Sequence, residues 1–148
     1  MISPILALRH SIVSRFSSGL LKDIPLYDRV PSGVEGLYIT FGDASVIDHS
    51  LHEAYRNYEV HFSLVVWSTP GEVFGERKNR SYGNAKRALE VGSRLIEVLH
   101  NAPLKLLEHE LIFMRSVSEK LTRDISTGST YVEIWFQAMT ECRIPVSD

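Results

Sequence analysis

The sequence predicts an α+β fold, in which a mostly antiparallel β-sheet carries two α-helices packed on one face. The chain has 148 residues, close to the length of one typical domain, so we expect a single domain over residues 1–148. The segments with strand patterns follow one another in hairpin-like pairs instead of alternating with helices, which favours antiparallel pairing. Two segments show the apolar spacing of three and four residues that is typical of amphipathic helices.

The first helix is expected over Pro4–Leu21, with Ser3 as its N-cap and Pro4 at the first helical position. Its apolar stripe comprises Ile5, Ile12, Phe16 and Leu20, widened by Leu6 and Val13. Gly19 indicates that the helix ends nearby.

Two extended segments and a loop follow this helix. Prolines and glycines bracket Leu26–Val30 as a short extended piece, and Leu37–Phe41 is rich in β-forming residues, so we expect a strand that ends at Gly42. The polar stretch Gly42–Glu53 is predicted to be a loop.

The strongest strand pattern lies at Ala54–Trp67, where apolar and polar residues alternate and Glu59 and His61 occupy the polar face. A long amphipathic helix is then predicted from about Gly75 to His100, where Pro103 stops it. The remaining expected elements are strands at Leu104–Leu107, Leu111–Glu119 and Thr130–Thr140, with a polar hairpin loop at Leu121–Ser129.

Composition excludes several classes of protein. Hydrophobic residues make up 44% and charged residues 23%, which is typical of a globular chain and not of disorder or a membrane bundle. Sixteen Lys and Arg oppose eighteen Asp and Glu, a net charge of −2. This charge argues against a protein that grips nucleic acid, although DNA could still pass it. The single cysteine, Cys142, excludes an internal disulfide, and no signal peptide or membrane-spanning segment is expected.

No complete catalytic motif is present. The sequence lacks a G-x-S-x-G nucleophile elbow, and the glycines Gly71 and Gly75 are not followed by the Lys-Ser/Thr of a phosphate-binding loop. The pattern His49-x-x-His52 with Glu53 could bring ligands to a metal ion if the segment formed a helical turn. The alternative is a solvated polar loop. We therefore expect no catalytic residue, metal or cofactor.

Several exposed features are candidates for contacts between proteins. Trp67, Tyr131 and Trp135 are expected on the face opposite the main apolar stripe, where they would form an interface or be covered by a helix or terminal segment. Asp28 and Arg29 lie between two prolines and would serve in assembly or form a salt bridge inside the fold. The loops Gly42–Glu53, Ser68–Asn79 and Leu121–Ser129 are expected to supply most partner contacts. Their charged candidates are Asp43, Asp48, Glu53, Glu72, Arg77, Lys78, Arg123 and Asp124.

The order and spacing of several short motifs resemble the tail completion family of tailed phages. These motifs are Leu26-Tyr27-Asp28-Arg29-Val30-Pro31, Tyr38-Ile39-Thr40-Phe41-Gly42, Val66-Trp67-Ser68, Leu99-His100-Asn101-Ala102-Pro103-Leu104, Leu121-Thr122-Arg123-Asp124 and Phe136-Gln137-Ala138. The resemblance spans about residues 5 to 140, nearly the whole chain.

The resemblance implies a tail terminator, or tail-to-head joining, protein of a phage, prophage or gene transfer agent. Such a subunit forms a ring, usually a hexamer, at the head-proximal end of the tail tube and joins the tube to the head-side connector. DNA passes through the lumen of the ring without specific binding. The implied partners are further copies of the chain, the tail tube protein and the connector or stopper protein. The implied location is the virion, after synthesis in the bacterial host cytoplasm.

Two other functions stay open from the sequence. One is a small metal-dependent hydrolase that uses His49, His52 and Glu53, which a bound ion lost on His49→Ala would support. The other is a head-side stopper protein of the neck, which would share the setting but not the partner.

Overall fold

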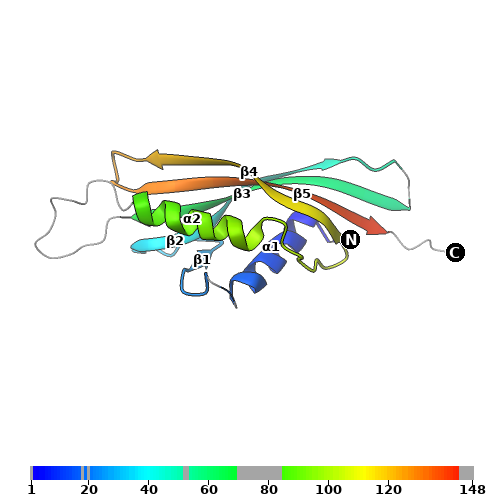
Figure 1. The fold of residues 1–148 in the computed structure, drawn as a ribbon, viewed down its shortest axis with the longest axis horizontal. Coiled ribbons are helices and arrows are strands. Elements are labelled where there is room, and N and C mark those ends of the chain that lie inside the picture. Colours follow the sequence, from blue (N-terminus) through cyan, green and yellow to red (C-terminus); the bar gives the residue numbers. More distant parts are fainter. Residues whose placement is uncertain (1, 18, 20, 52–53, 70–84, 144–148) are drawn as a thin grey trace, which may run out of the picture.

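The computed structural model describes residues 2–17, 19, 21–51, 54–69 and 85–143, which form one long sheet with two helices (Figure 1). The expected α+β class with both helices on one face of the sheet is confirmed. In chain order the elements are α1 (Pro4–Phe16), β1 (Leu26–Tyr27), β2 (Gly36–Asp48), β3 (Tyr55–Thr69), α2 (Ala85–Leu99), β4 (Glu110–Arg123) and β5 (Thr130–Arg143).

The sheet has the strand order β1-β2-β3-β5-β4. All neighbours are antiparallel except β1 and β2, whose parallel pairing involves only Leu26 with Ile39 and Tyr27 with Thr40. The long strands β3 and β5 therefore occupy the centre, β4 forms one edge, and β2 forms most of the other edge.

The core lies between the helices and one face of the sheet. On β3 the alternate residues Val60, Leu64 and Val66 are fully buried, as the period of two predicts, and β5 contributes Val132, Ile134, Phe136 and Ala138 from the same face. Helix α2 buries Ala88, Val91, Gly92, Leu95 and Leu99 against this layer. Gly92 permits this approach, because a Cβ atom there would lie 3.2 Å from Cδ1 of Ile134.

The cap of α1 is confirmed, since the Ile5 amide donates to Ser3 Oγ at 3.2 Å and Pro4 occupies the first turn. The expected end at Leu21 is wrong, because α1 stops at Phe16. Part of the expected stripe is also wrong: Leu6 and Val13 are 43% and 49% exposed, and Ala7 and Leu8 are buried in their place.

The strand β2 is much longer than expected, so the prediction of a loop from Gly42 was wrong. A β-bulge places Gly42 and Asp43 opposite Ser63, after which pairing with β3 resumes at Ala44 and continues to Asp48. A Cβ atom on Gly42 would lie 2.0 Å from Ser63 Oγ, so glycine fits this crossing of the two strands.

Two further expectations fail near β4. Residues 104–107 form no strand; Leu104 instead packs into the core as part of the connection after α2. The hairpin loop is shorter than Leu121–Ser129, because β4 continues to Arg123. For the long helix, Ala85–Leu99 is confirmed, whereas residues 75–84 lie outside the described part of the chain.

In the described residues, neither helix is long and apolar enough to span a membrane. Cys142 is buried and forms no disulfide.

Candidate interaction surface

The face of the sheet turned away from both helices, here called the open face, carries an aromatic row across three strands. Tyr38, Trp67 and Tyr131 occupy paired positions on β2, β3 and β5. The Tyr38 and Trp67 ring centroids lie 6.1 Å apart and stacked, and those of Trp67 and Tyr131 lie 4.6 Å apart. Trp67 Nε1 also donates to Thr40 Oγ1 at 3.0 Å. Side-by-side packing therefore shields this row: Tyr38 is only 8% exposed, and its burial raises the pKa of its hydroxyl.

Trp135 lies on the same face but in different surroundings. It is paired with Ser63 of β3 and Ser118 of β4, which are small neighbours, and it is half-buried. Of the two interpretations left open by the sequence, coverage by a helix is wrong, because both helices pack on the other face.

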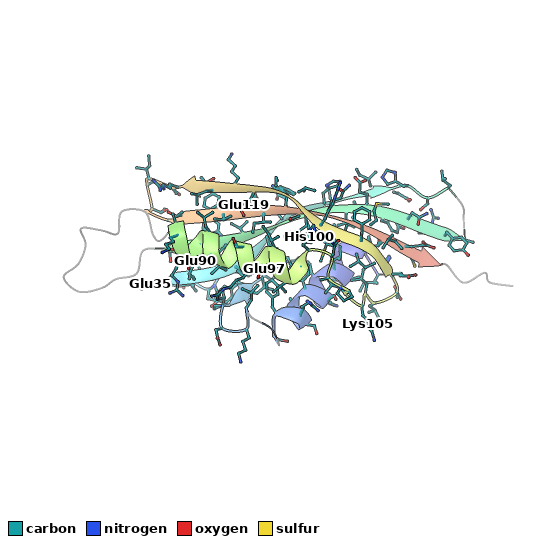
Figure 2. The ribbon with its side chains drawn as sticks, viewed as in Figure 1. Glu35, Glu90, Glu97, His100, Lys105 and Glu119 are labelled. Carbon is teal, nitrogen blue, oxygen red and sulfur yellow. The ribbon has the colours of Figure 1, made fainter. Side chains whose placement is uncertain are left out.

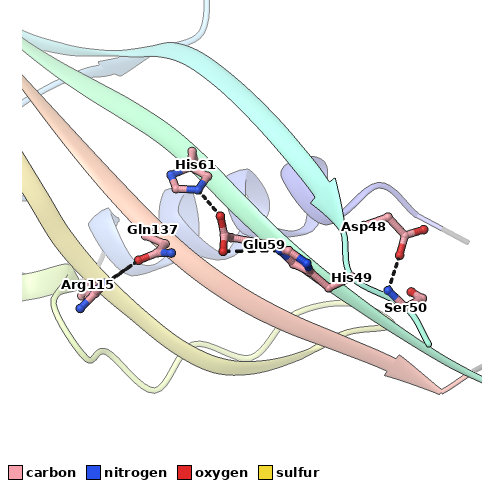
Figure 3. A network of polar contacts seen from close by, with 7 residues as sticks. All are labelled: Asp48, His49, Ser50, Glu59, His61, Arg115 and Gln137. Atoms are coloured by element: carbon pink, nitrogen blue, oxygen red, sulfur yellow. Dashed lines mark hydrogen bonds and ion pairs between the residues drawn. The ribbon is translucent and has the colours of Figure 1, made fainter. Parts of the chain in front are cut away.

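A polar network crosses the open face nearer the Asp48 end of the sheet (Figure 3). The carboxylate of Glu59 lies between two imidazoles, with Oε2 2.5 Å from Nε2 of His61 and Oε1 3.6 Å from Nε2 of His49. The hydrogen bond with His61 is the main reason that the pKa of Glu59 lies below its usual value. On the neighbouring strands Arg115 donates twice to Gln137 Oε1, at 2.8 and 3.0 Å.

This network was not predicted from the sequence, although Glu59 and His61 were expected on the polar face of their strand. The spacing of two between Glu59 and His61 could have indicated their contact, because residues i and i+2 of a strand share a face. The members of the network are joined by hydrogen bonds and ion pairs, and the one hydroxyl among the residues labelled in Figure 3, that of Ser50, accepts a hydrogen bond from the Asn57 amide at 3.0 Å. Across the described residues, no group of three or more His, Cys, Asp or Glu side chains is arranged to hold a metal ion.

Asp48 and Asp43, expected in a loop, belong to β2. Asp48 ends the strand, accepts a hydrogen bond from the Ser50 amide at 2.8 Å and lies 3.8 Å from Arg56. The bonds from Ser50 lower the pKa of Asp48. Asp43 lies in the β-bulge and is exposed.

Arg123 and Asp124 mark the opposite end of the sheet, where β4 turns into β5. Asp124 accepts hydrogen bonds from the amide and hydroxyl of Ser126, at 3.0 and 2.6 Å, which lower its pKa. Its own backbone closes the turn with Gly128 and Ser129. The carboxylate of Asp124 is thus engaged within its own turn.

Asp28 and Arg29 do not lie in a strand, since β1 ends at Tyr27. Asp28 forms an ion pair with Arg9 of α1, whose guanidinium also stacks 4.5 Å from the ring centroid of Phe41. Among the described residues no ion pair joins Arg29, whose side chain is exposed. The internal salt bridge weighed from the sequence therefore exists, but its cation is Arg9.

Some of the predicted contact residues lie at the two ends of the long sheet, whereas Asp43 and Trp135 lie midway along it, both opposite Ser63. Asp48 and His49 lie where β2 turns into β3, whereas Trp67, Arg123 and Asp124 lie at the other end, where Ser68 pairs with Thr130. Five of the candidate site residues lie outside the described residues: His52, Glu53, Glu72, Arg77 and Lys78. The role of these five stays a prediction.

Comparison with known proteins gives a family match and a structural match, each of high coverage. A family model described as tail completion protein gp17 matches residues 18–141. A chain in the virion of a native gene transfer agent particle has a similar structure, with a TM-score of 0.75 and 19% sequence identity. The match covers 95% of this chain and 99% of that chain, and at this identity it shows a shared fold. No curated protein sequence gives a significant match.

Proposed function

This chain belongs to the tail completion protein gp17 family, and from that membership we propose that it is the ring-forming subunit that ends the tail tube and joins it to the head. The ring, built from six copies, sits at the head-proximal end of the tube and docks to the head-side connector. The chain acts as a structural part of the virion and not as an enzyme.

The observation that carries this proposal is the extent of the family match. Residues 18–141 include all five strands except the last two residues of β5, together with α2. The family match therefore covers the whole sheet except those two residues, together with α2, but not α1. The similar fold of a chain in a gene transfer agent virion agrees with this role.

The arrangement of the sheet suits a subunit that touches one partner at each end. The β2–β3 connection with Asp48 and His49 lies at one end, and the β4–β5 turn with Arg123 and Asp124 lies at the other. One end would contact the tail tube and the other the connector. The small net charge of −2 suits a ring through which DNA slides, since strong phosphate binding would hold it in place.

The contacts within the chain show which candidate interface residues already have a described partner in the fold and which do not. Asp28, Asp124 and Trp67 already have partners within the chain. Arg29 and Asp43 are exposed without a described ion pair, which leaves them better suited to bind a neighbouring protein. Trp135 on the open face is half-buried and has only small cross-strand neighbours, Ser63 and Ser118.

Deleting the gene for this chain from the genome that encodes the particle tests this proposal. Electron microscopy of lysates should show tails of uncontrolled length and heads without tails, and a plasmid copy of the gene should restore both. Tails of normal length joined to heads in the deletion strain would refute the role.

A matched pair of variants then addresses the interface. Arg29→Ala should fold normally and still give tails of uncontrolled length, because its guanidinium has no described partner in the fold. Asp28→Ala removes only the exposed pair with Arg9, an interaction worth about 1 kcal/mol or less. Normal tails with Arg29→Ala would remove Arg29 from the interface.

A further inference from the structure

The two outer strands of the sheet each leave one stretch of backbone without a strand partner. Strand β4 pairs only with β5. On its other side, Asn101 donates its amide to the Met114 carbonyl at 2.8 Å, and His100 Nδ1 accepts from the Ser116 amide at 3.3 Å. Beyond these two contacts, residues 117–122 have no described strand partner on that side.

The edge at β2 has a matching open stretch. The short strand β1 pairs only with Ile39 and Thr40, so no described strand pairs with the outer side of residues 42–48. The two stretches lie at opposite edges of one sheet. Both expose apolar side chains: Val117 is 48%, Leu121 38% and Ile47 46% exposed. Open edges of this kind attract another strand unless something covers them.

The directions of the strands decide what can pair with both edges. Because β2, β3, β5 and β4 are successively antiparallel, β2 and β4 run in opposite directions. Copies related by rotation about an axis along the strands would present the β4 edge of one to the β2 edge of the next in antiparallel orientation. Antiparallel pairing is the slightly more stable kind, and such head-to-tail contacts close into rings.

We propose that residues 117–121 of one copy pair with residues 42–46 of the next, so that the sheet continues from subunit to subunit. This inference rests on the proposed ring. Residues 42–46 contain Asp43 and no basic residue, whereas residues 117–121 contain Lys120 beside Glu119. The occupant is a second copy because one chain supplies both edges, which run in opposite directions and can place Lys120 of one copy opposite Asp43 of the next.

One register satisfies the charges and the faces together. When Lys120 stands opposite Asp43, Ser118 meets Ser45 on the open face and Glu119 meets Ala44 on the helix face. Glu119, labelled on β4 in Figure 2, then lies away from Asp48, which avoids a like-charge pair.

Cysteine cross-linking in assembled particles tests this register. Residues opposite each other in an antiparallel pair have Cα atoms about 4.5–5.5 Å apart, which a disulfide can span. The chain with both Asp43→Cys and Lys120→Cys, supplied in place of the native gene, should give a ladder of covalent multimers after mild oxidation and non-reducing electrophoresis. The wild type controls for Cys142, which is buried. Asp43→Cys combined with Glu97→Cys on the exposed side of α2 (Figure 2) should give no ladder.

Charge exchange provides an independent readout. Asp43→Lys and Lys120→Asp should each reduce the yield of joined particles, and the double variant should restore it. Particles that contain a ring of this chain but show neither the ladder nor the restored yield would overturn the proposed edge pairing but not the proposed ring. Particles that contain no ring of this chain would overturn the proposed function as well.

Discussion

Replacing Trp67 with alanine should destabilise the isolated subunit strongly, although the residue faces away from the main core. Trp67 stacks with Tyr38 and Tyr131 and donates a hydrogen bond to Thr40. Removal of a fully buried Trp costs about 3–5 kcal/mol, and aromatic pairs add about 0.5–1.5 kcal/mol beyond buried area. Since Trp67 is half-buried but paired on both sides, we expect Trp67→Ala to lower the free energy of unfolding by about 2–4 kcal/mol.

Urea denaturation followed by far-ultraviolet circular dichroism measures this loss, with Trp135→Ala as the matched control. Trp135 is also half-buried on the open face, but its cross-strand neighbours are the small residues Ser63 and Ser118. Its truncation should therefore cost less than that of Trp67. Truncating one core side chain costs more than about 1 kcal/mol. If Trp67→Ala lowers the free energy of unfolding by less than that, the aromatic row does not stabilise the fold as we expect.

Three further predictions concern the core, the polar network and the β4–β5 turn. Gly92→Val should lower the Tm, because overpacking against Ile134 costs about 1–3 kcal/mol, and Ile134→Val should recover part of the loss in a thermal melt. Because the pKa of Glu59 is lowered from 4.5, its stabilising effect is present above that pH and is lost as the pH falls through the folded value. Urea titrations should therefore show Glu59→Gln less stable than the wild type at pH 7 and equally stable at the acid end. A difference in unfolding free energy that does not change with pH would contradict the hydrogen bond with His61. Asp124→Ala should lower the Tm more than Asp124→Asn, which can still accept hydrogen bonds in the turn; equal values would show that the turn bonds contribute little.

The centre of the fold could be predicted from the sequence because its residues alternate without interruption. On β3 every second residue from Val60 to Val66 faces the helices, so periodicity alone found the strand. The second half of β2 was missed for two physical reasons. It lies at an edge where polar side chains are tolerated, and the bulge at Gly42 and Asp43 interrupts the alternation.

The candidate site was less predictable, because charge alone does not show where a carboxylate finds its partner. Asp48 and Asp124 were predicted to contact other proteins, yet both accept hydrogen bonds from a serine two residues later. The Asp-x-Ser spacing is a known turn pattern and could have indicated this. The stacking around Trp67 could not be predicted in the same way, because it depends on the register of three strands.

Electron microscopy of the assembled particle at a resolution that traces strands tests the central claim most directly. The account predicts a closed ring of six copies at the head-proximal end of the tail tube, in which residues 117–121 of each copy pair with residues 42–46 of the next. A density for this chain elsewhere in the particle, or no closed ring at the end of the tube, would contradict the claim.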